Sequence, residues 1–507
     1  MKLEIDKIFR HSYSLSLIML LAFGLRIFGL DDHGIWFDEK VSISHAIGAT
    51  YVEDSLVTAN ITSGDLQQFW RYRHDFFKKV EIITKASGGN ALLYDLTLYA
   101  WIELFGLSDF SVRFLSVLFS LWSIIMIYKL AELMTNNKNI AILAAFLLSI
   151  SHLSIEYSHE ARTYAMATFL VLSSTILFYK IFFTQRSSIP LTLIFAYTSI
   201  NILCFFSHYF TLIALFGQGV FFLVSRPKRK HIGYLTLSYV LFFFLIGAFF
   251  LSFGQEGSDS LQQGNQGWSR LAKDPANRID ASFKNIFFEY FQVSTHLFGA
   301  GLHYLGIRLR YYVIILVVPV IFIFYAFEYA KKNGNLGLIL LPACIFLSHL
   351  LIMTINSILS SHTIPFVPKY ASLISPILII PIAVGIYSFY KKFKHNWRAN
   401  LITLQMVLFF LPTYAVYTDT NEKVGNACVR EKNPYPKAVT EIKKFLVDNP
   451  ESILTLSTTR MMEIKTLAFY FKEADRLRFE IAPDLKEQIM IKNGDDELGT
   501  ISLEYCF

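Results

Sequence analysis

Tyr234 to Leu251 of this chain reads YLTLSYVLFFFLIGAFFL, a run without a charged residue. A second run, Tyr311 to Ala330, reads YYVIILVVPVIFIFYAFEYA and contains one charge. Each run is close to the length of about 20 apolar residues that an α-helix needs to cross roughly 30 Å of hydrocarbon. Both runs therefore predict membrane-spanning helices.

The composition of the whole chain agrees with this assignment. Of 507 residues, 54% are hydrophobic and 48 are phenylalanine, and the mean hydropathy is +0.43. These values favour a polytopic membrane protein over a set of soluble domains. The formal charge of +7 is spread over short clusters between the apolar runs, so it does not indicate a nucleic-acid-binding protein.

The apolar runs predict an α-helical polytopic membrane protein with about eleven transmembrane helices and additional juxtamembrane helices. The first span is Tyr13 to Leu30, and its Arg26 is expected to extend from near the outer end to the interface. The other spans are residues 111–133, 140–156, 164–183, 191–206, 209–224, 232–253, 311–330, 336–356, 370–390 and 400–417.

Ala91 to Gly106 (ALLYDLTLYAWIELFG) decides on which side each loop lies. The run is short for a span and carries Asp95 and Glu103, which are costly in hydrocarbon. We therefore expect it to lie on the outer surface. With this choice every basic cluster falls on the side of the amino terminus, which is predicted to be cytoplasmic. The clusters are Lys129 with Lys138, Lys180 with Arg186, and residues 226–231, 331–332 and 391–398.

The same assignment predicts two domains. Residues 1–418 form a transmembrane domain with a large first extracytoplasmic loop, residues 31–110, in which residues 66–83 have the spacing of an interfacial helix. Residues 419–507 form a small extracytoplasmic α/β domain. Its predicted helices are residues 437–447 and 461–471, and its predicted strands are residues 452–456, 478–481 and 500–505.

The first loop begins with Asp31 to Ala46, DDHGIWFDEKVSISHA. This stretch places Asp38 and Glu39 beside Trp36 and Phe37, an aromatic pair suited to the headgroup boundary. A carboxylate pair at a membrane surface is a candidate catalytic site. The stretch is equally typical of a solvated loop that ends a helix, so the other loops decide between the two.

Ionisable residues of the other outer loops converge on the same face of the membrane. The candidates are His159, Glu160, Arg162 and Tyr164 in the segment SHEARTY, Lys369 and Tyr370 at the start of the tenth span, Arg113 at the start of the second span, and His208 between the fifth and sixth spans. Considered alone, Arg113 with Asp109 is also typical of a surface salt bridge. His208 alone is also typical of a hydrogen-bonded histidine at a helix end.

Cations and carboxylates together at a membrane surface suit a lipid-linked phosphosugar donor. Arg and Lys bind the phosphate that becomes the leaving group, while a carboxylate takes the proton of the acceptor hydroxyl as that hydroxyl attacks the anomeric carbon. Asp38 or Glu160 could instead bind a divalent metal ion, although scattered oxygen ligands are a weak metal signal. The sequence leaves open both this cofactor and whether Cys428 and Cys506 form a disulfide.

Four segments resemble the GT-C superfamily of membrane glycosyltransferases, in the branch of the protein O-mannosyltransferases and the lipid A aminoarabinose transferase. They are WFDEKVSISHA (36–46), NALLYDLTLYAWIELFGLSDFSVRFLSVLFS (90–120), SIEYSHEARTYAM (154–166) and PKYASLISP (368–376). The resemblance implies a polyprenyl-phosphate-linked sugar donor, an inverting transfer outside the membrane and Asp38 as the catalytic acidic residue. It also implies that Arg162, Lys369 and Tyr370 lie near the donor phosphate.

The chain departs from the pattern of this family at two places. Family members commonly carry a proline-containing motif where this chain has Gly89, Asn90 and Ala91. They often carry Arg where this chain has Lys369, and a lysine keeps the charge but loses the bidentate fork.

The favoured function is a glycosyltransferase of a bacterial-type inner membrane, with a protein, the lipid A core or another envelope glycan as acceptor. A flippase or transporter of polyprenyl-linked glycans is an alternative. It would carry ionisable residues at mid-span, lining a path, whereas here they gather at the outer ends of spans. A lipid-linked glycan polymerase or ligase is a third possibility, because it would share the site and take a longer glycan as donor.

Overall fold

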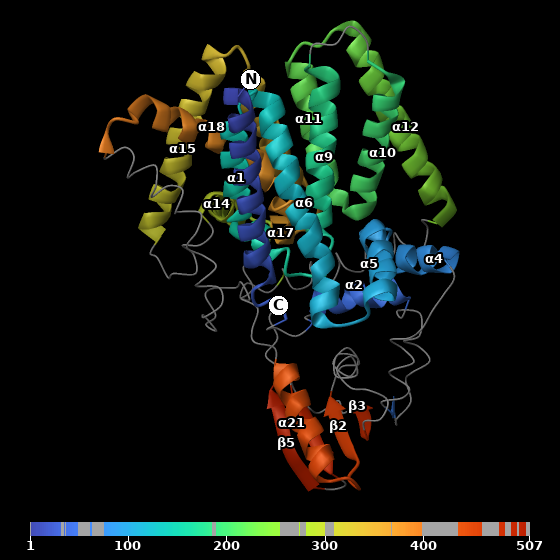
Figure 1. Ribbon diagram of the computed structural model, residues 1–507. Helices are drawn as coiled ribbons and strands as arrows, with labels where there is room; N and C mark the ends of the chain where they lie inside the picture. Colours follow the sequence, from blue (N-terminus) through green and yellow to red (C-terminus); the bar gives the residue numbers. More distant parts are fainter. Residues whose placement is uncertain are drawn as a thin grey trace. The chain divides into compact units, whose positions relative to one another are not determined.

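The structure of the chain is a computed structural model (Figure 1). It describes residues 2–31, 35, 37–48, 61–62, 76–184, 189–253, 273, 280–299, 309–366, 368–397, 434–458, 476–481, 488–493 and 496–502. The chain forms two compact units, and each is described by itself. The first comprises Met1–Phe28, Ser87–Tyr94 and Arg113–Asp419, and the second comprises Gly29–Ala86, Asp95–Val112 and Thr420–Phe507.

The first unit is a bundle of apolar helices. Five helices of the described residues are long and apolar enough to cross a membrane: α6 (Asp109–Thr135), α9 (Tyr164–Phe182), α12 (Arg229–Phe253), α16 (Gly337–Ser360) and α18 (Ser375–Phe393). The bundle also contains α1 (Lys2–Ile27), α7 (Lys138–Ser149), α10 (Leu191–Ser207), α11 (Leu212–Val224) and α15 (Leu309–Lys332). The chain is therefore a multi-pass membrane protein. The total of about eleven crossings stays a prediction, and residues 400–417 lie outside the described residues.

Short elements interrupt the bundle at one end. They are α8 (His152–Glu156), the 3-10 turns η2 (Tyr209–Thr211) and η5 (Ile364–Phe366), and α17 (Pro368–Ala371). The expectation of one continuous span over residues 140–156 is wrong, because Ser151 has an extended backbone, with φ −65° and ψ 125°, between α7 and α8. This break lets the chain after Ser149 turn away from the direction of α7.

The helix α14 (Phe283–Gly299) is amphipathic. Phe283, Phe287 and Phe288 are exposed, whereas Ile286 and Val293 are buried against the bundle. A helix with one buried apolar face and exposed aromatic rings is typical of the membrane interface.

Arg26, in the last turn of α1, is fully buried. The expectation that its side chain extends to the interface is therefore wrong. Its guanidinium makes five hydrogen bonds of 2.8–3.4 Å within the bundle, and a cation with its N–H groups bonded in this way can remain buried. The acceptors are the carbonyl oxygens of Ala22, Leu148 and Ser149 and the hydroxyls of Ser120 and Ser154.

The contacts of α6 indicate where the first large loop returns to the bundle. Ser120, in the first half of α6, accepts a hydrogen bond from Arg26 at the end of α1. Ser116 of α6 is also hydrogen-bonded to Tyr94, which precedes α6 in the chain, with 3.1 Å between the two hydroxyl oxygens. The chain between α1 and α6 thus returns to the end of the bundle that it left. The prediction that residues 91–106 do not cross the membrane stays a prediction.

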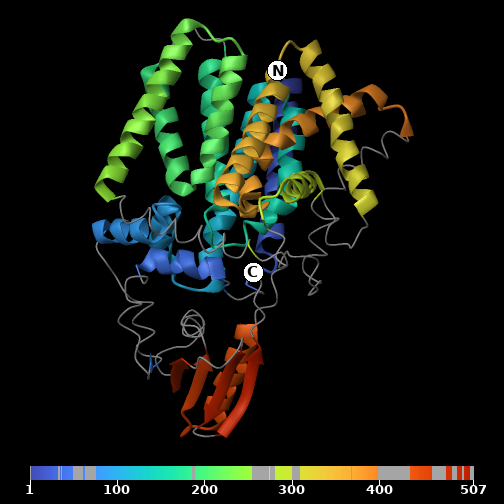
Figure 2. The same cartoon turned by 180° about the vertical axis from the view of Figure 1, so that it is seen from behind.

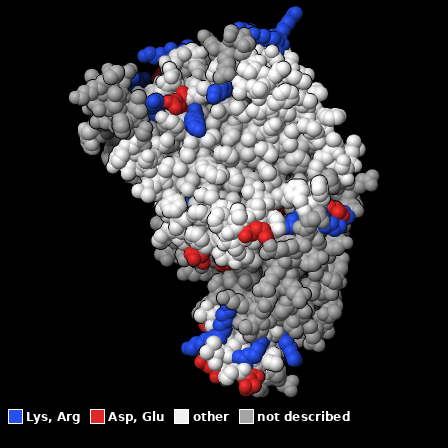
Figure 3. Space-filling model, turned by 45° about the vertical axis from the view of Figure 1, so that its right-hand side comes forward, with Lys and Arg blue, Asp and Glu red and all other residues white. Residues whose placement is uncertain are grey.

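Basic residues mark the opposite end of the bundle. Figures 1 and 2 show the start of α7 and the ends of α9, α11, α15 and α18 at this end. These termini carry or adjoin Lys138, Lys180, Arg226, Lys331 and Lys391. Figure 3 shows Lys and Arg side chains there and mostly uncharged atoms along the sides of the bundle. This is the pattern of a membrane bundle, although which end faces the cytoplasm stays a prediction.

The second unit contains α2 (Phe37–Ile47), most of α4 (Phe76–Ser87) and most of α5 (Leu92–Phe105). The part of the predicted interfacial helix that is described, residues 76–83, is helical, with Val80 and Ile83 buried and Phe76 exposed. At about 1.5 Å per residue, the 14 residues of α5 span about 21 Å, which is short for a bilayer core.

A five-stranded sheet with strand order β1-β3-β2-β4-β5 completes the second unit. The strands are β1 (Ile61–Thr62), β2 (Leu454–Thr458), β3 (Leu477–Ile481), β4 (Gln488–Asn493) and β5 (Asp496–Ser502), and β2 and β3 are parallel while the other pairs are antiparallel. Helix α21 (Pro434–Asp448) lies along one face (Figures 1 and 2). Strand β4 was not expected, and β1 comes from the first large loop. The predicted helix 461–471, Cys428 and Cys506 lie outside the described residues.

Candidate functional site

Two turns of the first unit meet at the end of the bundle where the helices are interrupted. The first turn, residues 157–163, joins α8 to α9, and the second joins α10 to α11 through His208 and η2. Thr163 donates a hydrogen bond of 2.6 Å to the carbonyl oxygen of Ser207. This bond ties the residue after Arg162 to the residue before His208, so the two candidate side chains belong to one local structure.

Aromatic rings from three segments surround His208. The imidazole lies 5.7 Å from the ring of Tyr164, 5.4 Å from Phe210 and 5.4 Å from Tyr370, measured between ring centres. The rings of Phe210 and Tyr370 are 4.5 Å apart, and Tyr157 packs against Tyr164 at 5.3 Å. We call Tyr157, Tyr164, His208, Phe210 and Tyr370 the aromatic cluster.

Two cations border the aromatic cluster. The guanidinium carbon of Arg162 lies 5.8 Å from the ring centre of Tyr164, and the ammonium nitrogen of Lys369 lies 5.5 Å from that of Tyr370. Burial, and then the charges of Arg162 and Lys369, lower the pKa of His208 to about 3. The imidazole is therefore neutral, and the positive potential around it favours an anion.

One hydrogen bond sets the tautomer of His208. Its Nδ1 atom accepts from the backbone N–H of Phe210 at 3.1 Å. Because Nδ1 is the acceptor in a neutral ring, Nε2 carries the proton. His208 therefore presents an N–H donor without a charge.

His208→Asn tests this protonation state. The amide oxygen of Asn can replace Nδ1 as acceptor, so we expect a small loss of melting temperature at pH 8. As the pH falls below the ordinary histidine pKa of 6.5, the unfolded wild-type chain takes up a proton that the folded chain refuses, so wild-type stability falls. The variant lacks this proton uptake, and the difference in melting temperature should shrink between pH 8 and pH 5. A difference that does not change with pH would contradict a neutral, buried His208.

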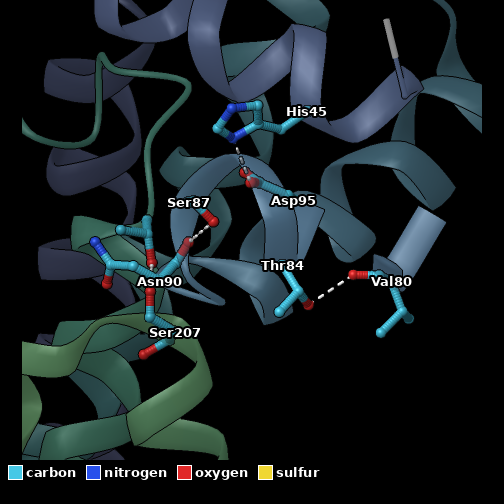
Figure 4. A network of polar contacts seen from close by, with 8 residues as sticks. His45, Val80, Thr84, Ser87, Asn90, Asp95 and Ser207 are labelled. Atoms are coloured by element: carbon cyan, nitrogen blue, oxygen red, sulfur yellow. Dashed lines mark hydrogen bonds and ion pairs between the residues drawn. The ribbon is translucent and has the colours of Figure 1, made fainter. Parts of the chain in front are cut away.

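The turn of residues 88–91 is hydrogen-bonded to Tyr209 of η2. Asn90 accepts from the backbone N–H of Tyr209 at 3.1 Å, and the Tyr209 hydroxyl donates to the carbonyl of Gly88. Ser87 donates to the carbonyl of Asn90 (Figure 4). Gly88, Gly89 and Ala91 have φ values of 65°, 82° and 66°. Proline has φ near −65°, so a proline cannot stand at any of these three positions.

Glu289 of α14 is a residue near the aromatic cluster that sequence reasoning missed. Burial raises the pKa of its carboxyl group to about 7, although a hydrogen bond with Thr363 acts in the opposite direction. Its neighbours on α14, Ile286 and Tyr290, pack in the same apolar cluster as Tyr370. The sequence marks this segment only by its aromatic residues, and no local pattern distinguishes Glu289 from a solvated acid.

In the second unit, Asp38 and Glu39 lie in the first turn of α2. Negative charge is favourable there because the backbone N–H groups of a helix start point toward it. Glu39 is fully buried, whereas Asp38 is partly exposed. A ligand approaching α2 can therefore reach Asp38 more easily than Glu39.

Buried pairs hold α2 and its neighbours together. His45 Nδ1 lies 3.3 Å from Asp95 Oδ2, which joins α2 to α5 (Figure 4). The ammonium group of Lys79 on α4 lies over the ring of Tyr99 on α5. Asp95, which the sequence marks as costly in hydrocarbon, thus has a partner within its own unit.

The structure brings together part of the predicted site. Within the first unit, Arg162, Tyr164, His208, Lys369 and Tyr370 meet at the aromatic cluster. The other three predicted residues of this unit are buried: His159 and Glu160 in the turn of residues 157–163, and Arg113 in α6. Asp38 and Glu39 belong to the second unit.

Comparison with known proteins identifies the fold. The structure of ArnT from Cupriavidus metallidurans in the apo state superposes with a TM-score of 0.51 at 14% identity, over 91% of this chain and 86% of ArnT. The chain has the fold of the GT-C membrane glycosyltransferases. The oligosaccharyltransferase of Archaeoglobus fulgidus in complex with Zn and sulfate is also similar, with a TM-score of 0.50 and 12% identity, over 93% of this chain and 62% of that protein.

Sequence matches cover a smaller part of the chain. Residues 90–250 match the family model of the dolichyl-phosphate-mannose-protein mannosyltransferases. An uncharacterized protein of Aquifex aeolicus is 26% identical over 161 residues, which are 31% of this chain and 32% of the relative. The range of the family model, residues 90–250, includes Arg162 and His208 but neither Asp38 nor Lys369.

A metal site is not evident in the described part of the chain. No group of three or more His, Cys, Asp or Glu side chains among the described residues could hold a metal ion. The predicted candidate ligands Asp38 and Glu160 belong to different units. The divalent metal ion therefore stays an open expectation of the sequence.

Proposed function

We propose that the chain is an inverting glycosyltransferase that moves a sugar from a polyprenyl-phosphate donor to an acceptor of the cell envelope. The observation that carries the proposal is the aromatic cluster with its two cations. Arg162 and Lys369, both partly buried, border a buried neutral imidazole and four further rings, in a place where charge-assisted bonds to a phosphate are stronger than in open solvent. Another structure of ArnT, with a TM-score of 0.51 and 12% identity, was determined bound to undecaprenyl phosphate.

The proposed reaction assigns one role to each unit. The hydroxyl of the acceptor attacks the anomeric carbon of the donor from the face opposite the phosphate, and Asp38 takes the hydroxyl proton. The bond between the anomeric carbon and the phosphate oxygen breaks, and polyprenyl phosphate leaves with the negative charge. Arg162, Lys369 and the Nε2–H group of His208 stabilise that charge, while Tyr370 and Tyr164 pack beside the phosphate.

The proposed setting is a bacterial-type inner membrane, with the amino terminus in the cytoplasm and the site outside. The domains are those expected from the sequence, a transmembrane domain of residues 1–418 and an extracytoplasmic domain of residues 419–507. The end of the bundle that carries the aromatic cluster is opposite the basic end, which supports this orientation (Figure 1).

Two measurements on the purified protein test the proposal. The first compares binding of undecaprenyl phosphate with binding of undecaprenol of the same chain length. We expect the phosphate to bind at least about 100-fold more tightly, because the charge-assisted contacts of both Arg162 and Lys369 depend on it. Equal affinity for the two lipids would overturn the assignment of a phosphate site.

The second measurement follows radiolabelled polyprenyl-phosphate sugars during incubation with envelope extracts as acceptors. A glycosyltransferase consumes the donor and transfers the label to the acceptor, whereas a flippase leaves the donor intact. Tight binding of undecaprenyl phosphate together with transbilayer movement of an unconsumed donor would replace the proposed function by transport.

A further inference from the structure

The segment that carries Arg162 is held in place by a set of polar residues inside the bundle. The segment runs from the last turn of α7 through α8 to the turn of residues 157–163. Arg26 bonds the carbonyl oxygens of Leu148 and Ser149 at 3.4 and 2.9 Å, and it bonds the Ser154 hydroxyl at 2.9 Å. One buried side chain thus contacts the end of α7 and the start of α8 at the point where the helix is interrupted.

The chemistry of the guanidinium suits this position. The carbonyl oxygens at the end of a helix lack helical partners, and they form the negative end of the helix dipole. Arg26 lies in the last turn of α1, and its guanidinium bonds a carbonyl oxygen at the end of α7. Its positive charge is therefore close to the negative ends of two helices. Among side chains, only arginine offers five N–H donors in a rigid fork.

Two serines of α6 bind the same segment at the carbonyl oxygens of Ser154 and Arg162. The Ser120 hydroxyl accepts from Arg26 at 2.8 Å and lies 3.1 Å from the carbonyl oxygen of Ser154. Four residues earlier, the Ser116 hydroxyl lies 3.3 Å from the carbonyl oxygen of Arg162 itself. Residues four apart share one face of a helix. Both serines are buried, so α6 presents two fixed hydroxyls to the segment.

We propose that Arg26, Ser116 and Ser120 are positioning residues that hold the segment of residues 148–163 and thereby place the Arg162 guanidinium for the donor phosphate. The proposal rests on the proposed function, in which Arg162 binds that phosphate. None of the three residues needs to touch the donor. Their effect is transmitted through the backbone, at the Ser154 and Arg162 carbonyl groups.

A matched pair of serines on α6 tests the proposal. Ser123 lines the same small cavity as Ser120 and Ser154 and is as buried as Ser116, but its hydroxyl donates to the Phe119 carbonyl of its own helix. Ser116→Ala removes the hydrogen bonds with the Arg162 carbonyl and with the Tyr94 hydroxyl. Loss of the bond to Arg162 is expected to raise the Kd for undecaprenyl phosphate about fivefold to tenfold, the effect of one hydrogen bond of ordinary strength. Ser123→Ala should change it by less than about twofold, although both variants lose a buried hydroxyl.

Two further variants separate positioning from general destabilisation. Ser116→Thr keeps the hydroxyl and should restore the wild-type Kd. In the background of Arg162→Ala, Ser116→Ala should have no additional effect on the Kd, because the group that it positions is absent. If Ser116→Ala still weakens binding there, or matches Ser123→Ala in the wild-type background, the positioning role is overturned.

The same variants distinguish failure of this inference from failure of the proposed function. If Arg162→Ala leaves the Kd unchanged, the phosphate site itself is wrong. If Arg162→Ala weakens binding and the Ser116 variants do not, only the positioning role is wrong. Arg26→Lys supplies fewer donors than arginine and should lower the melting temperature as well as the affinity. If that variant does not accumulate, the serine variants still decide.

Discussion

Arg162→Ala is expected to weaken binding of undecaprenyl phosphate about 100-fold, which corresponds to the loss of two charge-assisted hydrogen bonds. The guanidinium stands beside the Tyr164 ring, and its charge reaches His208. Arg162→Lys keeps the charge and loses the planar fork, so its Kd should fall between those of wild type and Arg162→Ala. The affinity is measured by titration of the purified protein in lipid nanodiscs.

Lys369 provides a comparison within the same site. Lys369→Met should weaken binding about tenfold, less than Arg162→Ala, because a lysine contributes a single point of contact. Lys369→Arg keeps the charge and introduces the planar fork of a guanidinium, so it should preserve or improve the affinity. Arg229→Ala removes an exposed arginine at the basic end of the bundle and serves as the control. Equal losses for Arg229→Ala and Arg162→Ala would mean that net charge, and not a phosphate site, controls binding.

Chain order and hydropathy were sufficient to group part of the site. Arg162, His208 and Lys369 lie in different hairpins, but each follows or precedes a long apolar run. Counting the runs places all three at one end of the bundle, where the structure brings them together at the aromatic cluster. Because a helix hairpin reverses direction by geometry alone, this inference needs no side-chain detail.

The interruptions of the helices could not be predicted in the same way. Residues 140–156 are apolar enough to suggest one span, yet Ser151 separates α7 from α8. Both sides of this break are hydrogen-bonded to Arg26, whose acceptors are 94 to 128 residues away in sequence, apart from one in its own helix. A lone arginine in an apolar run indicates only the free-energy cost of burying its charge and does not reveal its hydrogen-bond partners. The spacing of Ser116 and Ser120, four residues apart, was a usable signal of a polar face within the span.

The sheet of the second unit shows a similar limit. Strands β2 and β3 follow from local patterns in the tail, but β1 comes from residues 61–62 of the first large loop and pairs with Phe479 and Arg478 of β3. Pairing between segments about 400 residues apart leaves no trace in local periodicity. The partly buried Glu289 could not be predicted for the same reason, because its environment is built by residues that are distant in sequence.

Asp38→Asn is expected to lower the rate of sugar transfer about a thousandfold, within the range that a positioned general base contributes. The amide has nearly the shape of the carboxylate but cannot take the proton of the acceptor hydroxyl. Binding of undecaprenyl phosphate should be unchanged, because that lipid is held by Arg162 and Lys369. The measurement is single-turnover transfer from a radiolabelled donor, with protein level and melting temperature recorded in parallel.

Asp38 is chosen over Glu39 because its side chain is more exposed and because the helix that carries it is held in place by a neighbouring helix. Glu39 is fully buried, whereas Asp38 is partly exposed at the start of α2. Helix α2 is tied to α5 by the pair of His45 and Asp95, so the carboxylate stands on a supported element. Glu103→Gln, which changes an exposed acid of α5 in the same unit, is the control and should retain activity. Near-full transfer by Asp38→Asn would refute its role as base, and loss of transfer in both variants would point to damage of the second unit instead of loss of a proton acceptor.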